Sequence, residues 1–344
     1  MTTIPATPAP AAGAAPPLIP PVPERPPSAY ERALAAARKF SAAALAASTR
    51  RGYRADWQAF TDWCAGLEER PSALPAAPET VAAFLSRESF ERNLGFATVK
   101  RRASGIARAH AAAGLPAPTR AKLVVDTLRG IRNERALPPR KKKAATEDLL
   151  RAMIARTADD LRGCRDRAIL LGGFGGAFRR SELAALEVAW LAWTPKGVVA
   201  TLPRSKGDPE GEGQSVPLLR TGGPLCPVAA LEAWLARSGI TRGPVFRAIF
   251  RTTRTDVSER LASRALDGGS VARIVQRYAR LAGENAAEFG GHSLRRGPLT
   301  AAARRRASIW KMQELGRYRS LDVLLDYVEP ADDLFEGHAL DGIV

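Results

Sequence analysis

Two short stretches near the end of the chain are the most informative part of the sequence: GHSLR at 291–295 and LGRYRSLDVLLDYV at 315–328. In the second stretch Ser320 is a suitable helix N-cap, because its hydroxyl can accept a bond from a free N–H of the next turn. Tyr327 lies about 110° from the centre of the apolar stripe that follows, so we expect a packed ring and a hydroxyl that reaches solvent. The residues with this i, i+3, i+4, i+7 spacing, which predicts a half-buried helix, are Leu321, Leu324, Leu325 and Val328.

A second signal is the spacing of His292 and Arg295, which are three positions apart and share one face if the backbone there is helical. A histidine, an arginine and a tyrosine on the flank of a helix, in a basic protein, together suggest phosphoryl transfer with tyrosine as the nucleophile. A tyrosine considered alone is more often a packing residue. The combination of motifs therefore carries more weight than any single side chain.

Three segments in this order resemble the sequence boxes of the tyrosine recombinases, the phage-integrase family. GHSLRRG at 291–297 is similar to the H-x-x-R box of the family, and GRYRSLDVLLDY at 316–327 is similar to its final box. Upstream, GAFRRSEL at 176–183 resembles the G-L-R-x-S-E-L box. The final box of the family has His or Trp nine residues before the nucleophilic tyrosine, whereas here Tyr318 stands nine residues before Tyr327.

The resemblance implies a phosphoryl transfer, which needs a nucleophile, fixed cations on the non-bridging oxygens and an acid for the leaving oxygen. Arginine suits the second task, since its planar and permanently charged head group can bind two oxygens. Arg180 and Arg296 are neighbouring candidates, but the motif spacing favours the arginines at 179 and 295. The resemblance implies a role for each of these residues. Tyr327 would attack the phosphate and give a 3′-phosphotyrosine, Arg179 and Arg295 would clamp the phosphate oxygens, and Lys206 would protonate the 5′ oxygen. The supporting roles are assistance as base or hydrogen-bond partner for His292, orientation of the site for Glu182, and a ring with a hydrogen-bond donor for Tyr318.

The composition fits a nucleic-acid partner. The 344 residues are 45% hydrophobic with a net charge of +17 and an isoelectric point near 10.6, so the chain can form two cores and should bind a polyanion. Three scattered cysteines without a CxxC pair, and three histidines, do not support a disulfide framework or a metal site. No run is long and apolar enough to span a membrane. We expect a cytoplasmic protein, bacterial or encoded by a phage or plasmid and associated with the nucleoid, with no metal or other cofactor.

The N-terminal part is predicted to be a tail followed by a helical domain. Residues 1–27 are rich in Pro and Ala and almost uncharged, which predicts disorder. Residues 28–135 predict a helical bundle whose second helix has a largely aromatic core stripe at 53, 57, 60 and 64. The order of these helices resembles the core-binding domain of Cre-like recombinases. The basic residues predicted to bind DNA here, several of them at helix starts where phosphates are favoured, are Arg50, Arg51, Arg54, Lys100, Arg101 and Arg102.

A basic segment with two prolines, residues 136–145, predicts the boundary between two domains. Its Lys141, Lys142 and Lys143 are predicted to contact the DNA backbone, and the alternative is a charged linker that is only solvated. At the other end, the apolar residues of 330–344 predict a tail that supports assembly with other copies. Docking of this tail on its own domain is the alternative.

Between these segments, residues 146–329 predict a catalytic domain of helices with one β-hairpin. The hairpin is expected from the strand-like segments 198–202 and 214–218, and Lys206 stands at its turn. Ser181 is expected to cap a helix with the sequence ELAALEVAW. This hairpin resembles the one that carries the catalytic lysine of the family.

The prediction is a mainly α protein with a small β-sheet, an N-terminal helical core-binding domain and a C-terminal tyrosine-recombinase catalytic domain. We expect a Cre-like site-specific recombinase that binds double-stranded DNA with inverted half-sites, acts as a homotetramer on paired sites, and exchanges strands through a Holliday junction without ATP. Two alternatives remain: a type IB topoisomerase that relaxes DNA as a monomer, and a sequence-specific DNA-binding protein that has lost catalysis.

Overall fold

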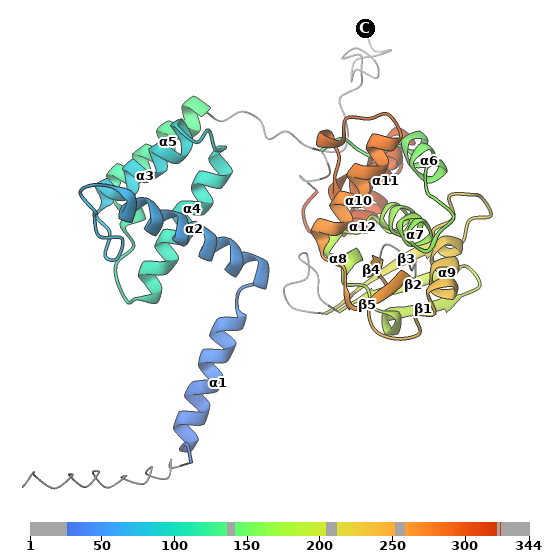
Figure 1. Ribbon diagram of the computed structural model, residues 1–344, viewed down its shortest axis with the longest axis horizontal. Coiled ribbons are helices and arrows are strands. Elements are labelled where there is room, and N and C mark those ends of the chain that lie inside the picture. Colours follow the sequence, from blue (N-terminus) through green and yellow to red (C-terminus); the bar gives the residue numbers. More distant parts are fainter. Residues whose placement is uncertain (1–25, 136–141, 204–211, 252–258, 322–323, 325–344) are drawn as a thin grey trace, which may run out of the picture. The chain divides into compact units, whose positions relative to one another are not determined.

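The computed structural model describes residues 26–135, 142–203, 212–251, 259–321 and 324. The chain forms two compact units, Met1–Pro139 and Arg140–Val344, which we call the helical unit and the C-terminal unit. Mainly helical structure with small antiparallel sheets confirms the fold class expected from the sequence (Figure 1). The α-helices of the helical unit are α1 (Ala29–Ala43), α2 (Ala47–Gly66), α3 (Pro78–Phe90), α4 (Phe96–Ala112) and α5 (Lys122–Arg135).

The C-terminal unit combines helices with a three-stranded and a two-stranded sheet. None of the helices in the described parts of the chain is long and apolar enough to cross a membrane. The elements of this unit are α6 (Glu147–Ala155), α7 (Leu161–Gly175), α8 (Arg180–Ala184), β1 (Leu191–Thr194), β2 (Gly197–Leu202), β3 (Gln214–Leu219), α9 (Pro227–Ser238), β4 (Arg247–Arg251), β5 (Glu259–Ala265), α10 (Gly268–Leu281), α11 (Gly291–Arg304) and α12 (Ile309–Gly316).

The helical unit has an aromatic core where the sequence predicted one. Phe60 of α2 is fully buried, and its ring centroid lies 5.1 Å from that of Phe84 on α3. His110 of α4 is also buried. Its Nδ1 donates to Ile106 O at 2.9 Å and its Nε2 accepts from Ala76 N at 3.0 Å, so the contacts define a neutral ring and explain why this histidine is structural.

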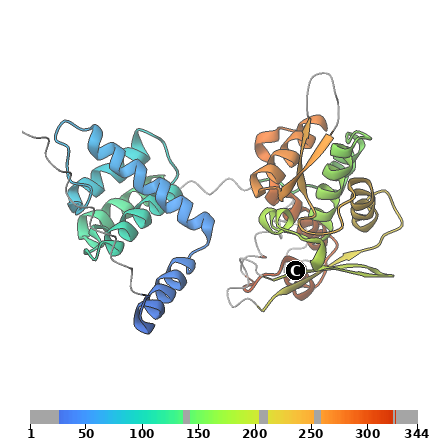
Figure 2. The ribbon, with the colours of Figure 1, turned by 60° about the horizontal axis from the view of Figure 1, so that its bottom comes forward.

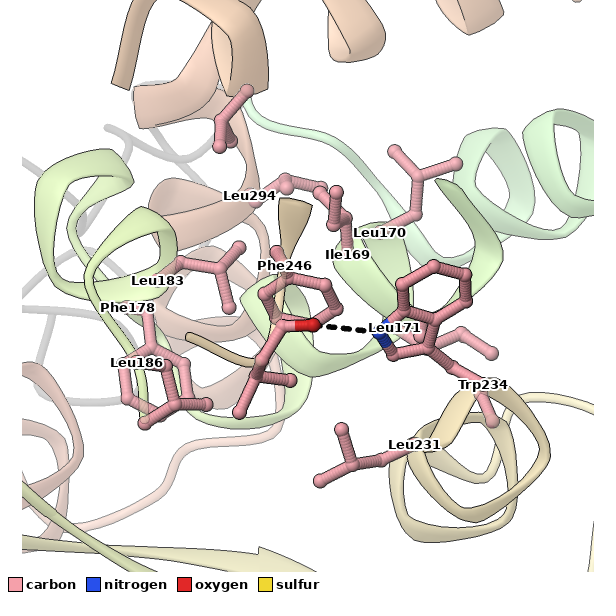
Figure 3. Close-up of a cluster of buried hydrophobic side chains, with 14 of the residues drawn as sticks. Ile169, Leu170, Leu171, Phe178, Leu183, Leu186, Leu231, Trp234, Phe246 and Leu294 are labelled. Carbon is pink, nitrogen blue, oxygen red and sulfur yellow. Dashed lines mark hydrogen bonds between the residues drawn. The ribbon is translucent and has the colours of Figure 1, made fainter. Parts of the chain in front are cut away.

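α7 is the central helix of the C-terminal unit. It contacts α9 and β3 on one side and α10 and α11 on the other (Figures 1 and 2). Its Ile169 packs in one apolar cluster with Leu183 of α8 and Leu294 of α11 (Figure 3). Trp234 of α9 closes this core, and its ring N–H donates to Val245 O at 2.8 Å (Figure 3). The core therefore fixes α8 and α11, which carry two of the three boxes.

The predicted hairpin is present as the antiparallel pair β2–β3, and β1 extends it to a three-stranded sheet in the order β1-β2-β3. Alternate residues of β2 and β3 are buried, which is the pattern of strands with one face on a core. A second hairpin, β4–β5, was not predicted from the sequence.

The helix expected after Ser181 was wrong in its start and its length. The N-cap is Arg179, and α8 ends at Ala184. The remainder of the expected helix pairs with another segment instead: Val188 N–H donates to Gly243 O at 2.9 Å, and the chain then enters β1. Backbone pairing with a distant segment has overridden a local helical preference.

The helix expected after Ser320 falls almost entirely outside the described residues. Leu324 is described, and it is buried beside Leu299 and Met312, as a member of the apolar stripe should be. Other expectations that fall outside the described residues concern Tyr327, Lys206, Lys141, the tail at 330–344 and almost all of the tail at 1–27.

Candidate active site

The arginine box lies in the turn between α7 and α8. The helix α7 is capped by Gly176, and Ala177 has φ 43°, a left-handed backbone that is uncommon for alanine. The ring of Phe178 lies directly on Gly176, where an added Cβ would be 2.3 Å from a ring carbon. This turn presents the carbonyl oxygens of Gly176 and Ala177 to arginines of the other two boxes, and it leaves Arg179 as the N-cap of α8.

Glu182 orients Arg179. Its Oε2 accepts the backbone N–H of Arg179 at 2.9 Å, and its Oε1 accepts from Nη1 of the same residue at 2.5 Å. Burial raises the pKa of this carboxyl, but the charge of Arg317 and the hydrogen bonds from Arg179 outweigh burial and lower the pKa below its ordinary value. Glu182 is thus an anion at neutral pH that holds the Arg179 side chain, which is compatible with the orienting role implied by the resemblance.

The H-x-x-R box forms the first turns of α11. Gly290 N donates to Ser293 Oγ at 3.1 Å, which fixes the start of the helix. The backbone is helical from Gly291 onward, so His292 and Arg295 meet the condition for sharing one face. Their catalytic roles remain predictions.

Arg295 is completely buried, and its guanidinium group is bound inside the protein. Nη1 donates to Ala177 O at 2.8 Å, Nε donates to the Tyr318 hydroxyl at 3.1 Å, and Nη2 donates to Gly316 O. The residue predicted to clamp a phosphate therefore joins all three boxes in this structure. These three bonds use three of its five N–H groups.

The final box begins where α12 ends. Gly316 is followed by Arg317, whose φ of 49° ends the helix in a left-handed turn. The ring of Tyr318 folds back over Gly316, where an added Cβ would be 2.4 Å from a ring carbon. The same ring lies under Arg295, with Cζ 4.6 Å from its centroid, a distance at which a cation is attracted to the ring face.

Arg317 is a site residue that the sequence analysis missed. Its side chain is buried; Nη1 donates to Gly176 O at 2.8 Å, and Nη2 donates to Ala177 O at 3.0 Å and to Glu182 Oε2 at 2.9 Å. The available signal was its place inside the final box. Neither its left-handed backbone nor its burial could be derived from residue spacing.

The three boxes together create an excess of positive charge. His292 is exposed on α11. Its pKa is lowered most by partial desolvation, and then, in decreasing order, by the charges of Arg295, Arg296, Arg179 and Arg180. Its imidazole is therefore neutral at neutral pH and can accept a proton or a hydrogen bond. Arg317 and Arg179 act in the same way on the Glu182 carboxylate, and the charges of Arg295 and Arg179 also lower the pKa of Arg317. Such an arrangement attracts an anion with several oxygens, such as a phosphodiester.

A cavity of about 500 Å³ opens beside Tyr318. It is lined by the start of β3, by α12 with Trp310, and by Arg317 and Arg319. The hollow connects the final box to the β2–β3 hairpin, whose expected catalytic residue, Lys206, lies outside the described residues. A larger cavity of about 630 Å³ belongs to the helical unit and contains no residue of the three boxes.

Two of the residues predicted to bind DNA contact buried carboxylates of the helical unit. Arg101 donates to Asp56 at 3.0 Å, and Arg102 lies 2.5 Å from the carboxylate of Glu88, which is completely buried. Arg102 thus has a structural role that the sequence analysis did not foresee. The remaining predicted residues of this unit are exposed, and their contact with DNA remains a prediction: Arg50, Arg51, Arg54 and Lys100.

The basic segment after residue 141 is bound to the C-terminal unit. Lys142 Nζ donates to Ala287 O, and Lys143 Nζ lies 2.7 Å from a carboxylate oxygen of Glu288. Both lysines are exposed, so their predicted contact with DNA is compatible with these bonds but untested. Ala145 N also donates to Ser293 O at 3.0 Å, which ties the segment to the start of α11.

The fold of the chain is that of solved integrases. The structure is similar to a lambda integrase fragment (75-356) solved as a dimer bound to a COC′ core site, with a TM-score of 0.58 and 16% identity over 87% of this chain and 95% of that chain. It is also similar to the Tn1549 transposon integrase solved in complex with transposon right end DNA, with a TM-score of 0.57 and 12% identity over 90% and 97% of the two chains. At such identities these likenesses show the fold alone.

The sequence comparison identifies the family. The chain is 34% identical over 301 residues to the integrase/recombinase xerD homolog of Selenomonas ruminantium, a match that covers 85% of this chain and 84% of the relative. The chain therefore belongs to the tyrosine recombinase (integrase) family of DNA-cleaving and rejoining enzymes. No protein-family model matches it.

Proposed function

We propose that the protein is a site-specific recombinase in which Tyr327 attacks the scissile phosphate of double-stranded DNA. The phenol oxygen forms a bond to phosphorus and the bond from phosphorus to the 5′ oxygen breaks, leaving a 3′-phosphotyrosine and a free 5′-hydroxyl. His292 accepts or shares the phenol proton, and Lys206 supplies the proton to the 5′ oxygen. Arg179 and Arg295 stabilise the charge on the non-bridging oxygens. The reverse attack by a 5′-hydroxyl of another strand completes the exchange.

The observation that carries this proposal is that arginines from all three boxes meet at Glu182 and the Ala177 carbonyl, and that arginines of two of these boxes act on the neutral imidazole of His292. Fixed guanidinium groups can stabilise the transition-state charge without a metal ion. The phosphotyrosine ester conserves the energy of the original phosphodiester, so no ATP is required. Tyr318 completes the site with its ring against Arg295 and its hydroxyl on Nε of the same residue.

The DNA partner is proposed to be a pair of duplex sites with inverted half-sites, bound by a cytoplasmic homotetramer that passes through a Holliday junction. Support comes from the relatives: the lambda integrase fragment was solved as a dimer on a core site, and the sequence relative is a recombinase. In this proposal the helical unit contacts DNA through its exposed basic residues, and the lysines at 141–143 contact the backbone. The tail at 330–344 contributes to assembly.

The test is a trapping experiment with duplex fragments of the DNA that flanks the gene for this chain. Each fragment carries a nick a few nucleotides to the 3′ side of a candidate scissile phosphate, so that the short 5′-hydroxyl strand dissociates and the covalent adduct accumulates. Wild-type protein should form an adduct mapped to Tyr327, and Tyr327→Phe should bind the same fragment without forming one. An adduct formed by Tyr327→Phe would overturn the assignment.

The same protein should be added to a supercoiled plasmid without half-sites. A type IB topoisomerase would relax this plasmid, whereas a site-specific recombinase should leave it supercoiled. If the wild-type protein bound half-sites but formed no adduct, the hypothesis of a DNA-binding protein that has lost catalysis would be favoured.

A further inference from the structure

Arg317 occupies an unusual place for a long cationic side chain. It is the C-cap of α12 with a left-handed backbone, φ 49°, and its side chain is only 7% exposed. Its Cζ also lies 5.5 Å from the ring centroid of Phe178. Both terminal nitrogens of the residue thus bond the arginine box, although it belongs to the final box.

The contacts of Arg317 are shared with the predicted phosphate clamps. Glu182 Oε2 accepts from Arg317 Nη2 at 2.9 Å and from the backbone N–H of Arg179 at 2.9 Å, while Oε1 accepts from Arg179 Nη1 at 2.5 Å. The Ala177 carbonyl accepts from Nη2 of Arg317 at 3.0 Å and from Nη1 of Arg295 at 2.8 Å. Glu182 therefore lies between two arginines, and its position depends on both.

We propose that Arg317 is a positioning residue for DNA cleavage, which fixes the Glu182 carboxylate and through it the guanidinium group of Arg179. The inference rests on the proposed function, and it adds to that function a residue that need not touch the substrate. Glu182 has two oxygens and three donors on them, so removing the Arg317 donor frees Oε2 to turn away from the Arg179 backbone N–H. Arg179 would then keep its charge but lose its fixed direction, and preorganised direction is what makes such a charge catalytic.

Arginine is required here for geometric reasons. Its planar head group reaches Gly176 O through Nη1 and both Ala177 O and Glu182 Oε2 through Nη2. A lysine has one nitrogen, so it cannot span these three acceptors in the same directions. Arg317→Lys therefore keeps the charge of the cluster while it removes the bridge.

The matched control is Arg220→Lys. Arg220 forms a two-bond pair with Glu232, with Nη1 at 2.9 Å and Nη2 at 2.6 Å from the carboxylate oxygens, on the exposed surface of the same unit. It therefore repeats the arginine–glutamate chemistry outside the three boxes. Glu182→Gln supplies the second background, because it keeps the size of the side chain but removes the carboxylate through which Arg317 is proposed to act.

The experiment measures single-turnover adduct formation on the nicked fragments at saturating protein, together with half-site affinity and the unfolding temperature of each full-length variant. We expect Arg317→Lys to slow adduct formation at least about tenfold, with half-site affinity within about twofold, and Arg220→Lys to leave both unchanged. In the Glu182→Gln background, Arg317→Lys should slow the reaction by less than about twofold, because the path to Arg179 is already broken.

Such non-additivity is a readout that a merely structural role would not produce. The inference is overturned if Arg317→Lys cleaves within twofold of the wild-type rate, if its effect is the same in the Glu182→Gln background, or if its loss of rate only follows a loss of folded protein. A wild-type protein that forms no Tyr327-dependent adduct would instead overturn the proposed function. The parallel Tyr327→Phe reaction separates these two failures.

Discussion

Buried carboxylates are surrounded by arginines in both units of the chain, but the two networks shift a carboxylate pKa in different directions. In the helical unit, Asp56 and Glu88 are both buried and pair with Arg101 and Arg102, and Arg87 also lies 3.2 Å from Glu88. In the C-terminal unit, Glu182 is shared by Arg179 and Arg317, and the charge of Arg295 also acts on Arg317.

The pKa values move in opposite directions in these two networks. Burial raises the pKa of Asp56, and the lowering effects of Arg101 and Arg102 do not compensate for it. The pKa of Glu182 is lowered despite its burial, because Arg317 and Arg179 outweigh desolvation. The first network joins α2, α3 and α4, whereas the second holds Arg179, which is predicted to clamp the phosphate. The first network is therefore expected to act on stability and the second on the reaction.

The largest expected effect is on cleavage, from Arg179→Ala. Loss of a preorganised charge contact typically costs about a hundredfold to a thousandfold in rate, so adduct formation should slow at least about a hundredfold, and Arg295→Ala should behave alike. Binding should change far less, because many other cations contact the DNA backbone. Arg101→Ala in the helical unit is the matched control and should leave the single-turnover rate on saturated DNA nearly unchanged. If the rate of Arg179→Ala fell only in step with affinity, this arginine would be an ordinary phosphate contact.

The next effect is on stability, from Arg102→Ala. The change leaves the carboxylate of Glu88, which is completely buried, without its closest cation, while Arg87 remains nearby. Loss of one partner of a buried charged contact should lower the free energy of unfolding by about 1–3 kcal/mol. Urea unfolding of the full-length protein measures this, with Arg51→Ala as an exposed control. An unchanged midpoint for Arg102→Ala would show that the network is dispensable, and the predicted contact of Arg102 with DNA would regain weight.

A smaller and opposite pair of effects is expected from acid. The folded-state pKa of Glu182 lies below its ordinary 4.5, so its stabilisation is complete above that pH and is lost as the pH falls through the folded value. The folded-state pKa of Asp56 lies above its ordinary 3.8, so its burial destabilises at neutral pH, and protonation relieves this cost as the pH falls. Thermal unfolding from pH 7 down to about pH 2 checks both. Glu182→Gln should lose less stability than the wild type as the pH falls, and Asp56→Asn should be more stable than the wild type at neutral pH. If Glu182→Gln lost as much stability in acid as the wild type, the assignment would be contradicted.

The sequence predicted the parts of this fold that depend on local pattern. The β2–β3 hairpin follows from two alternating segments around a turn, and the helical backbone under His292 and Arg295 agrees with their spacing. The helix expected after Ser181 was too long, because the strong local preference of ELAALEVAW was overridden by pairing with the segment at 243–245.

The site was predicted only as a set of residue types. The roles of Arg317 and Arg102 could not be predicted, because their partners lie on other elements and only the folded chain brings them together. The left-handed backbone of Ala177 was equally inaccessible, since alanine gives no signal for it. Spacing therefore selects candidate residues, whereas the sharing of one carboxylate or one carbonyl between two arginines is a tertiary property.

The smallest expected effect concerns Tyr318, where the family has His or Trp. Its ring lies under Arg295 and over Gly316, and its hydroxyl accepts one bond from Nε of Arg295. Tyr318→Phe keeps the ring and removes that bond, whose net worth is about 1 kcal/mol, so cleavage should slow by no more than about fivefold. Tyr318→Ala also removes the packing that separates Arg295 from the cavity, and it should be far more defective. If Tyr318→Phe were as slow as Tyr318→Ala, the hydroxyl would be the functional part, and its donation to a phosphate oxygen would replace packing as the explanation. Mapping of the peptide linked to DNA completes the test: an adduct on Tyr318 in place of Tyr327 would contradict the roles proposed for both residues, because Tyr318 would then be the nucleophile.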